Sequence, residues 1–114
     1  MEKIAECLKA LSDPTRLRVI RLLERGELCV CDLMEGLDLP QSKVSRHMSF
    51  LKNSGWVTGV RRGKWVYYSL AEPEDSIQRR VLEVLREGLQ QVPQAEEDYK
   101  RLCSYLETKV TESC

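Results

Sequence analysis

The strongest constraint on the fold is a change of sequence period near residue 56. Before that point apolar residues recur at intervals of three and four, which is typical of helices. Residues 56–61 and 64–70 are instead rich in aromatic and β-branched side chains, and they flank the turn dipeptide Arg62-Gly63, so they predict a β-hairpin. The pattern therefore predicts one domain of the α+β class, mainly α with a small β-hairpin, over all 114 residues.

Capping residues divide the helical part of the sequence. Asp13-Pro14 is an N-cap followed by a first-turn proline, Gly26 and Gly36 are expected to end helices, and Gly55 suits the left-handed residue after a helix. The helices expected before the hairpin are 2–11, 14–25, 29–36 and 41–53. Two more apolar stripes, 77–92 and 99–110, follow the hairpin and are separated by a proline. Two helices joined by a tight turn and followed by a basic hairpin predict a winged helix-turn-helix, with the helix-turn-helix at 29–53 and the wing at 56–70.

The net charge of zero hides an uneven distribution. Residues 1–70 carry 12 Lys and Arg against 8 Asp and Glu, whereas residues 71–114 carry 6 against 10. Residues 40–70 contain six basic residues and no acid, a local pattern that favours contact with a phosphate backbone. The residues expected to contact double-stranded DNA are Gln41, Ser42, Lys43, Ser45, Arg46 and His47 in the recognition helix, and Arg61, Arg62 and Lys64 at the hairpin tip.

The helices at both ends carry more apolar surface than a small core can cover. We therefore expect a homodimer formed through residues 1–12 and 76–112, in keeping with the palindromic sites of helix-turn-helix proteins. No apolar run is long enough to cross a membrane, and the first residues lack a signal-peptide pattern, so we expect a cytoplasmic protein without a membrane partner.

Five cysteines in a reducing compartment suggest ligands, sensors or core residues more than disulfides. Cys29 and Cys31 lie two residues apart, ahead of the predicted recognition helix, and clustered thiolates bind soft thiophilic ions. The alternative is that both are small buried residues. Their position beside a DNA-binding element favours a metal or metalloid sensor.

Five segments resemble the ArsR/SmtB family of metal-responsive repressors. They are Ser12 to Leu17, Glu27 to Leu33, Val44 to Met48, Asn53 to Gly55 and Gly63 to Tyr68. The resemblance implies a homodimeric winged-helix repressor that leaves its operator when an inducer binds. Within that family, the segment Glu-Leu-Cys-Val-Cys-Asp-Leu is found in the arsenic/antimony and cadmium/lead branches, so As(III) or Sb(III) is the expected inducer, with no catalytic cofactor.

One position departs from the arsenite-responsive pattern, in which a third cysteine follows three residues after the second. Here that residue is Met34, whose neutral thioether is a poor substitute for a thiolate. We expect Cys103 as the third ligand, with Cys114 or Cys7 as alternatives. A small thiol could also fill the position, or the inducer could be an organic trivalent arsenical that needs two protein thiolates. Cd or Pb sensing and thiol oxidation remain alternatives within the same fold.

An enzyme is the less favoured class. The thiols are not spaced as the Cys-x-x-Cys of thioredoxin-like proteins, and no other catalytic set is present.

If Cys29 and Cys31 both lay in a regular helix, their side chains would point about 200° apart. Binding one ion would then require the first turn of the short helix to unwind, and this would displace the recognition helix.

Overall fold

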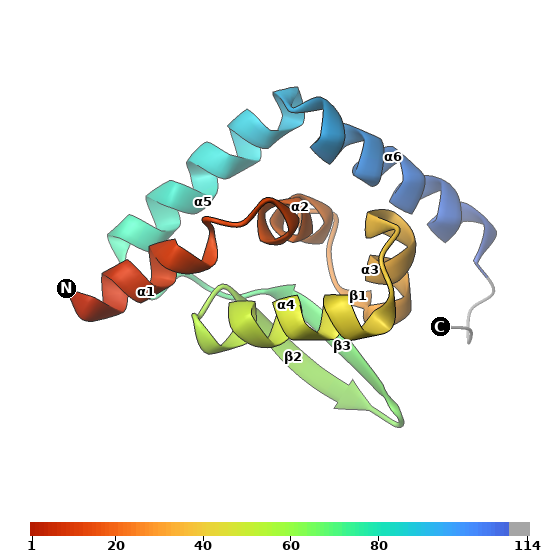
Figure 1. Ribbon diagram of the computed structural model, residues 1–114, viewed down its shortest axis with the longest axis horizontal. Coiled ribbons are helices and arrows are strands. Elements are labelled where there is room, and N and C mark those ends of the chain that lie inside the picture. The colour runs from red at the N-terminus through yellow and green to blue at the C-terminus, as the bar shows by residue number, and fades with distance from the viewer. Residues whose placement is uncertain (110–114) are drawn as a thin grey trace.

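The structure, a computed structural model, describes residues 1–109. Its elements follow one another along the chain as shown in Figure 1. They are α1 (Glu2–Ala10), α2 (Pro14–Leu23), β1 (Leu28–Cys29), α3 (Val30–Leu37), α4 (Gln41–Asn53), β2 (Val57–Arg62), β3 (Trp65–Leu70), α5 (Ser76–Gly88), the 3-10 turn η1 (Leu89–Gln91) and α6 (Pro93–Thr108). The predicted stripe residue Val110 and the end of the range 76–112 lie outside the described residues.

Two of the expected capping residues are confirmed, whereas α2 ends at Leu23, two residues before the expected end. The Asp13 carboxylate accepts hydrogen bonds from the backbone N–H groups of Thr15 at 2.8 Å and Arg16 at 3.1 Å, and so begins α2. Gly55 follows α4 with a φ of 87°, a left-handed conformation that glycine adopts at low cost. The expectation that Gly36 ends α3 is wrong: the left-handed residue is Asp38, with a φ of 56°.

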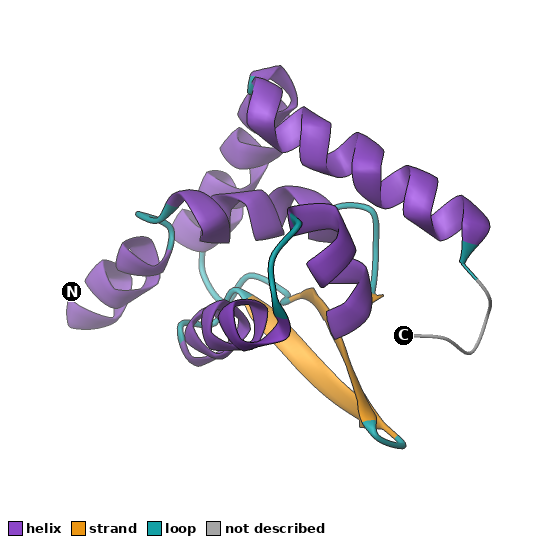
Figure 2. Ribbon diagram, turned by 45° about the vertical axis from the view of Figure 1, so that its right-hand side comes forward, coloured by secondary structure: helices purple, strands orange, loops and turns teal. Residues whose placement is uncertain are grey.

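The sheet has one more strand than the sequence pattern indicated. β1 pairs with β3 in antiparallel register, Leu28 opposite Tyr68 and Cys29 opposite Tyr67, so the strand order is β1-β3-β2. The expected helix at 29–36 is therefore corrected at its start, because Cys29 is extended and precedes the first helical residue, Val30. The wing is the β2–β3 hairpin, which projects from the helical body beneath α4 (Figures 1 and 2).

The hydrophobic core lies between α2, α3 and α4 and is covered by α6. Its largest fully buried side chains include Trp56, Ile20, Leu33, Met48 and Leu102. Trp56 is thus part of the core and is not available to stack on bases. α6 runs across α2 and α3 (Figure 1), which places its apolar side within the chain's own core.

This packing bears on the expected dimer surface, which stays a prediction. Leu102 is fully buried, and Tyr99 and Leu106 pack against the core, so the stripe on the last helix is used within one chain. Several of the apolar side chains left exposed lie on α1 and α5, and others lie on α4 and in the wing. Those on α1 and α5 include Leu8 and Ile77, each 43% exposed, and Val84, which is 66% exposed. Among residues 1–109, no helix has the length and apolarity needed to span a membrane.

Candidate DNA-binding face and thiol site

The recognition helix α4 presents one polar face to solvent. Val44, Met48 and Leu51 point into the core at helical spacing, which turns the remaining positions outward. Of the residues expected to contact DNA in this helix, the four exposed ones are Gln41, Ser42, Lys43 and Arg46. The short connection Asp38 to Pro40 joins this helix to α3, so the position of α4 depends on that of α3.

Two of the expected DNA contacts are less accessible. Ser45 and His47 are half-buried, and His47 Nδ1 lies 3.4 Å from a guanidinium nitrogen of Arg16 in α2. The Arg16 guanidinium in turn covers the ring of Phe50 at 4.1 Å. Burial lowers the pKa of His47, and neighbouring cations lower it further despite Asp13. His47 is therefore placed at the junction of α2 and α4, and not on the open face of the recognition helix.

The wing carries three exposed cations. Arg61, Arg62 and Lys64 lie at or next to the turn of the hairpin, away from the helices (Figures 1 and 2). Arg62 is held on one side, because its Nη1 lies 2.6 Å from Oε1 of Glu27, the residue just before β1. This arrangement places positive charge at the end of a projecting hairpin, on the same side of the molecule as α4.

Cys29 and Cys31 lie at the junction of β1 and α3. Cys29 is fully buried and Cys31 is half-buried. The Cys29 backbone N–H donates to Oδ2 of Asp32 at 2.9 Å, and the Cys29 sulfur faces the Asp32 backbone N–H in the reciprocal half of a capping box. The sequence reasoning missed Asp32, although Cys29-x-x-Asp32 has the spacing of such a box.

The end of α6 covers this pair of thiols. Lys109 Nζ lies 2.6 Å from Oδ1 of Asp32 and 3.6 Å from the sulfur of Cys29. Burial opposes the charged form of Lys109, but the hydrogen bond to Asp32 and the nearby negative groups raise its pKa above the ordinary value. The pKa of Tyr105, one turn earlier, is also raised, chiefly by burial. Lys109 is 77 residues from Asp32 in the chain, so no local sequence pattern could have indicated this contact.

The other cysteines lie elsewhere. Cys103 is half-buried on α6, and no three His, Cys, Asp or Glu side chains within residues 1–109 are grouped to hold a metal ion. Cys103 therefore does not join Cys29 and Cys31 in a three-ligand group in this arrangement. Cys114 lies outside the described residues. The described part of the chain offers a soft ion two sulfurs beside a lysine and a carboxylate.

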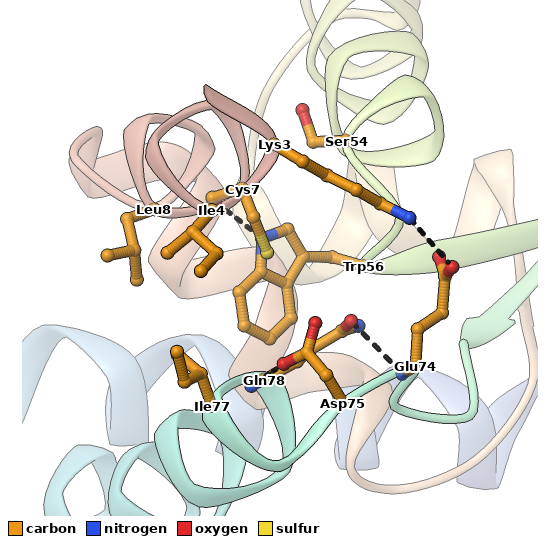
Figure 3. A pocket seen from close by; sticks show the side chains of 10 residues that line it. All are labelled: Lys3, Ile4, Cys7, Leu8, Ser54, Trp56, Glu74, Asp75, Ile77 and Gln78. Atoms are coloured by element: carbon orange, nitrogen blue, oxygen red, sulfur yellow. Dashed lines mark hydrogen bonds and ion pairs between the residues drawn. The ribbon is translucent and has the colours of Figure 1, made fainter. Parts of the chain in front are cut away.

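Cys7 belongs to a small cavity between α1 and α5, of about 20 Å³ (Figure 3). Its backbone carbonyl accepts a hydrogen bond from Trp56 Nε1 at 2.7 Å, and Gln78 Nε2 donates to the Gly55 carbonyl at 2.9 Å beside it. Burial raises the pKa of the Cys7 thiol, as do the charges of Asp75 and Glu74, so the thiol is disfavoured as a thiolate ligand. We interpret this cavity as part of the packing contact between α1 and α5.

Comparisons with known proteins agree with this architecture. A sequence model described as "Bacterial regulatory protein, arsR family" matches residues 13–58. The arsenical resistance operon repressor of Escherichia coli K12 is 49% identical over 67 residues, which cover 58% of this chain and 57% of that protein. The arsenical resistance operon repressor of Bacillus subtilis is 39% identical over 75 residues, which cover 65% of this chain and 71% of that protein.

A solved structure shows the same fold. The homodimeric winged helix-turn-helix DNA-binding domain from Mycobacterium bovis has a TM-score of 0.65 and 26% identity, over 75% of this chain and 77% of that one. The sequence matches centre on the helix-turn-helix, and the matched segment spans little more than half of the Escherichia coli relative.

Proposed function

We propose that this chain, which belongs to the ArsR/SmtB family of winged-helix transcriptional regulators, is a homodimeric repressor that trivalent arsenic or antimony releases from operator DNA. The family consists of transcriptional regulators and not of enzymes. The observation that carries the proposal is the thiol pair, Cys29 and Cys31, at the start of the helix that positions α4. The names of the Escherichia coli and Bacillus subtilis relatives support arsenic as the inducer.

DNA binding is supported by the distribution of charge and shape. α4 and the wing lie on one side of the chain (Figures 1 and 2), α4 exposes polar residues, and the wing exposes cations. α4 fits the width of a major groove, and the hairpin can reach the flanking backbone. Two such units related by twofold symmetry would read two half-sites. We place the protein in the cytoplasm, where thiols are kept reduced and available to a soft ion.

The chemistry of the inducer site follows from its donors. Arsenous acid reacts with two thiols by forming two As–S bonds, while each thiol proton leaves with an arsenic hydroxyl group as water. The product keeps one hydroxyl on arsenic, which a third thiol would replace in the same way. Lys109 stands 3.6 Å from the Cys29 sulfur and must move aside for arsenic to bind there.

The test compares Cys29→Ser and Cys31→Ser with the wild-type protein in an anisotropy assay on a duplex enriched from a random-sequence library by the wild-type protein. Each variant should bind this duplex and stay bound when sodium arsenite is added, because each has lost one of the two sulfurs. Cys7→Ser is the matched control, because the Cys7 thiol lies in the separate cavity between α1 and α5. Release of either variant at the wild-type arsenite concentration would show that the pair is part of the core and not the sensor.

A second candidate inducer is favoured by the number of sulfurs. Within residues 1–109 no third His, Cys, Asp or Glu side chain is grouped with Cys29 and Cys31 to hold a metal ion, and a monosubstituted trivalent arsenical has two exchangeable positions on arsenic. Phenylarsine oxide should therefore release the wild-type protein as well as arsenite does. If any one of Cys103→Ser, Cys114→Ser and Cys7→Ser abolishes the response to arsenite but not to phenylarsine oxide, a third protein thiolate is required for arsenite alone.

A further inference from the structure

We infer that Glu27 is a positioning residue that couples the thiol pair to the wing, so that inducer binding acts on DNA through β1 and β3 as well as through the recognition helix. This inference rests on the proposed function, because it concerns how inducer binding at the thiol pair changes the affinity for DNA. The sequence indicated a path through α3 alone. The structure adds a second path, since Cys29 is itself part of the sheet that carries the wing.

Three contacts and the backbone from Glu27 to Cys29 form a closed circuit between the thiol segment and the wing. Cys29 pairs with Tyr67 of β3, and the guanidinium of Arg62 in β2 lies 5.0 Å from the centre of the Tyr67 ring. Arg62 Nη1 in turn lies 2.6 Å from Glu27 Oε1, and Glu27 is two residues before Cys29. A change in the backbone conformation of Cys29 can therefore displace Arg62 in two ways, through Tyr67 and through Glu27.

The pairing of β1 is short enough to be lost. β1 contains only Leu28 and Cys29, and both pair with the central strand β3. Without β1, the wing is a two-stranded hairpin, which is marginally ordered in water because too little of it is covered. β1 is thus the part of the sheet that ties the wing to the helical body on this side.

Inducer binding acts directly on this pairing. The Cys29 sulfur now faces the Asp32 backbone N–H, and the Cys29 backbone is extended, with φ −88° and ψ 170°. To share one arsenic atom with Cys31, the Cys29 side chain must leave the capping contact, which requires its backbone to turn. That turn removes the bridge to Tyr67 and withdraws Glu27 from Arg62.

The ion pair itself is suited to a coupling role. The Arg62 and Glu27 side chains are 54% and 34% exposed, and ion pairs at such sites contribute little to stability. Loss of the pair should therefore change the placement of the wing without unfolding the protein. Glu27→Gln should bind DNA more weakly than wild type in the absence of inducer, because its wing already lacks this tether, and should lose much of its response to inducer.

The experiment measures the dissociation constant of the library-selected duplex with and without sodium arsenite. Couplings between sites are typically about 5–150-fold. We expect arsenite to weaken wild-type binding about tenfold or more, and to weaken Glu27→Gln binding about threefold or less. Glu97→Gln is the matched control, because it also removes one charge from an exposed ion pair, with Arg101 at 3.2 Å, but lies on α6. It should respond as wild type does.

Two experimental outcomes distinguish a failure of the inference from a failure of the proposed function. If arsenite does not release the wild-type protein, the proposed function fails. If arsenite releases Glu27→Gln as fully as wild type, the inference fails and the proposed function stands. Arsenite binding to each variant, followed by the thiolate-to-arsenic absorbance, should be equal, since Glu27 does not contribute a ligand. A loss of binding in Glu27→Gln would overturn the positioning role.

Hydrogen exchange gives a readout that does not depend on DNA. Arsenite should increase amide exchange in residues 65–70 of the wild-type protein, because β3 loses the pairing with β1. In Cys29→Ser the same segment should not change on addition of arsenite. Unchanged protection of 65–70 in arsenite-bound wild type would overturn the proposed path through the sheet.

Discussion

At the scale of single residues, Gly36 illustrates how closely α3 packs. A Cβ placed there would lie 2.8 Å from Leu22 Cδ1 and 3.2 Å from Leu102 Cβ. The glycine therefore serves the approach of α2 and α6 to α3, and not the end of a helix. This matters for the thiol site, because α3 and α6 together enclose it.

Replacing Gly36 with alanine should destabilise the protein. The added methyl group forces Leu22 and Leu102 to move, and overpacking of this kind costs about 1–3 kcal/mol, offset in part by the better helix propensity of alanine. Urea unfolding followed by circular dichroism measures the change. Gly88→Ala is the control, because nothing lies within 4 Å of its Cβ, and it should be neutral or stabilising by up to about 1 kcal/mol. Equal stability of the two variants would contradict the close packing.

At the scale of elements, α4 and the wing should contribute to DNA binding in different ways. Gln41 and Arg46 lie on the open face of α4, where they can reach base edges, whereas Lys64 is at the tip of the hairpin, where phosphates are nearer. The two elements can therefore be distinguished by salt dependence and by sequence preference.

Gln41→Ala and Arg46→Ala should relax base preference and cost about 1–3 kcal/mol for each lost bidentate contact. Lys64→Ala should weaken binding to all duplexes alike and reduce the slope of log K against log salt by about one. Anisotropy titrations on the selected duplex and on a scrambled one, at several salt concentrations, provide both quantities. His47→Ala should affect binding less than Arg46→Ala does, because His47 faces Arg16. The reverse order would place His47 at the DNA.

At the scale of the whole molecule, the exposed apolar side chains of α1 and α5 point to the dimer surface. Leu8, Ile77 and Val84 lie on these two helices. Lys3 of α1 pairs with Glu74, which lies just before α5. α6 packs on its own chain, so we expect a second copy to bind on the α1–α5 side. The homodimeric relative from Mycobacterium bovis supports a dimer of this fold.

Val84→Lys should shift the protein from dimer to monomer at micromolar concentration, because a charge replaces an apolar side chain that is 66% exposed in the single chain. Sedimentation velocity in reducing buffer measures the shift. Val60→Lys is the control: Val60 is 49% exposed but lies in the wing, and the variant should remain dimeric. A dimeric Val84→Lys protein together with a monomeric Val60→Lys protein would move the interface to the wing.

The sequence by itself determined the elements whose signals are local. Hydrophobic period, the Asp13-Pro14 helix start and the Gly55 stop depend on neighbours a few residues away, so α2, α4 and the hairpin could be predicted close to their observed bounds. The acid-free basic segment and the adjacent thiols are likewise readable from residue type and spacing alone.

Only the tertiary structure decided what depends on contacts between distant residues. β1 is two residues long and forms because β3 lies beside it. The local sequence pattern therefore predicted, wrongly, that Cys29 begins a helix. Asp32 meets Lys109 across 77 positions, and Glu27 meets Arg62 across 35. The apolar stripe of α6 could face a partner or its own core, and burial against α2 and α3 settled the choice. Such contacts are fixed by how the elements assemble, and no short-range pattern specifies that assembly.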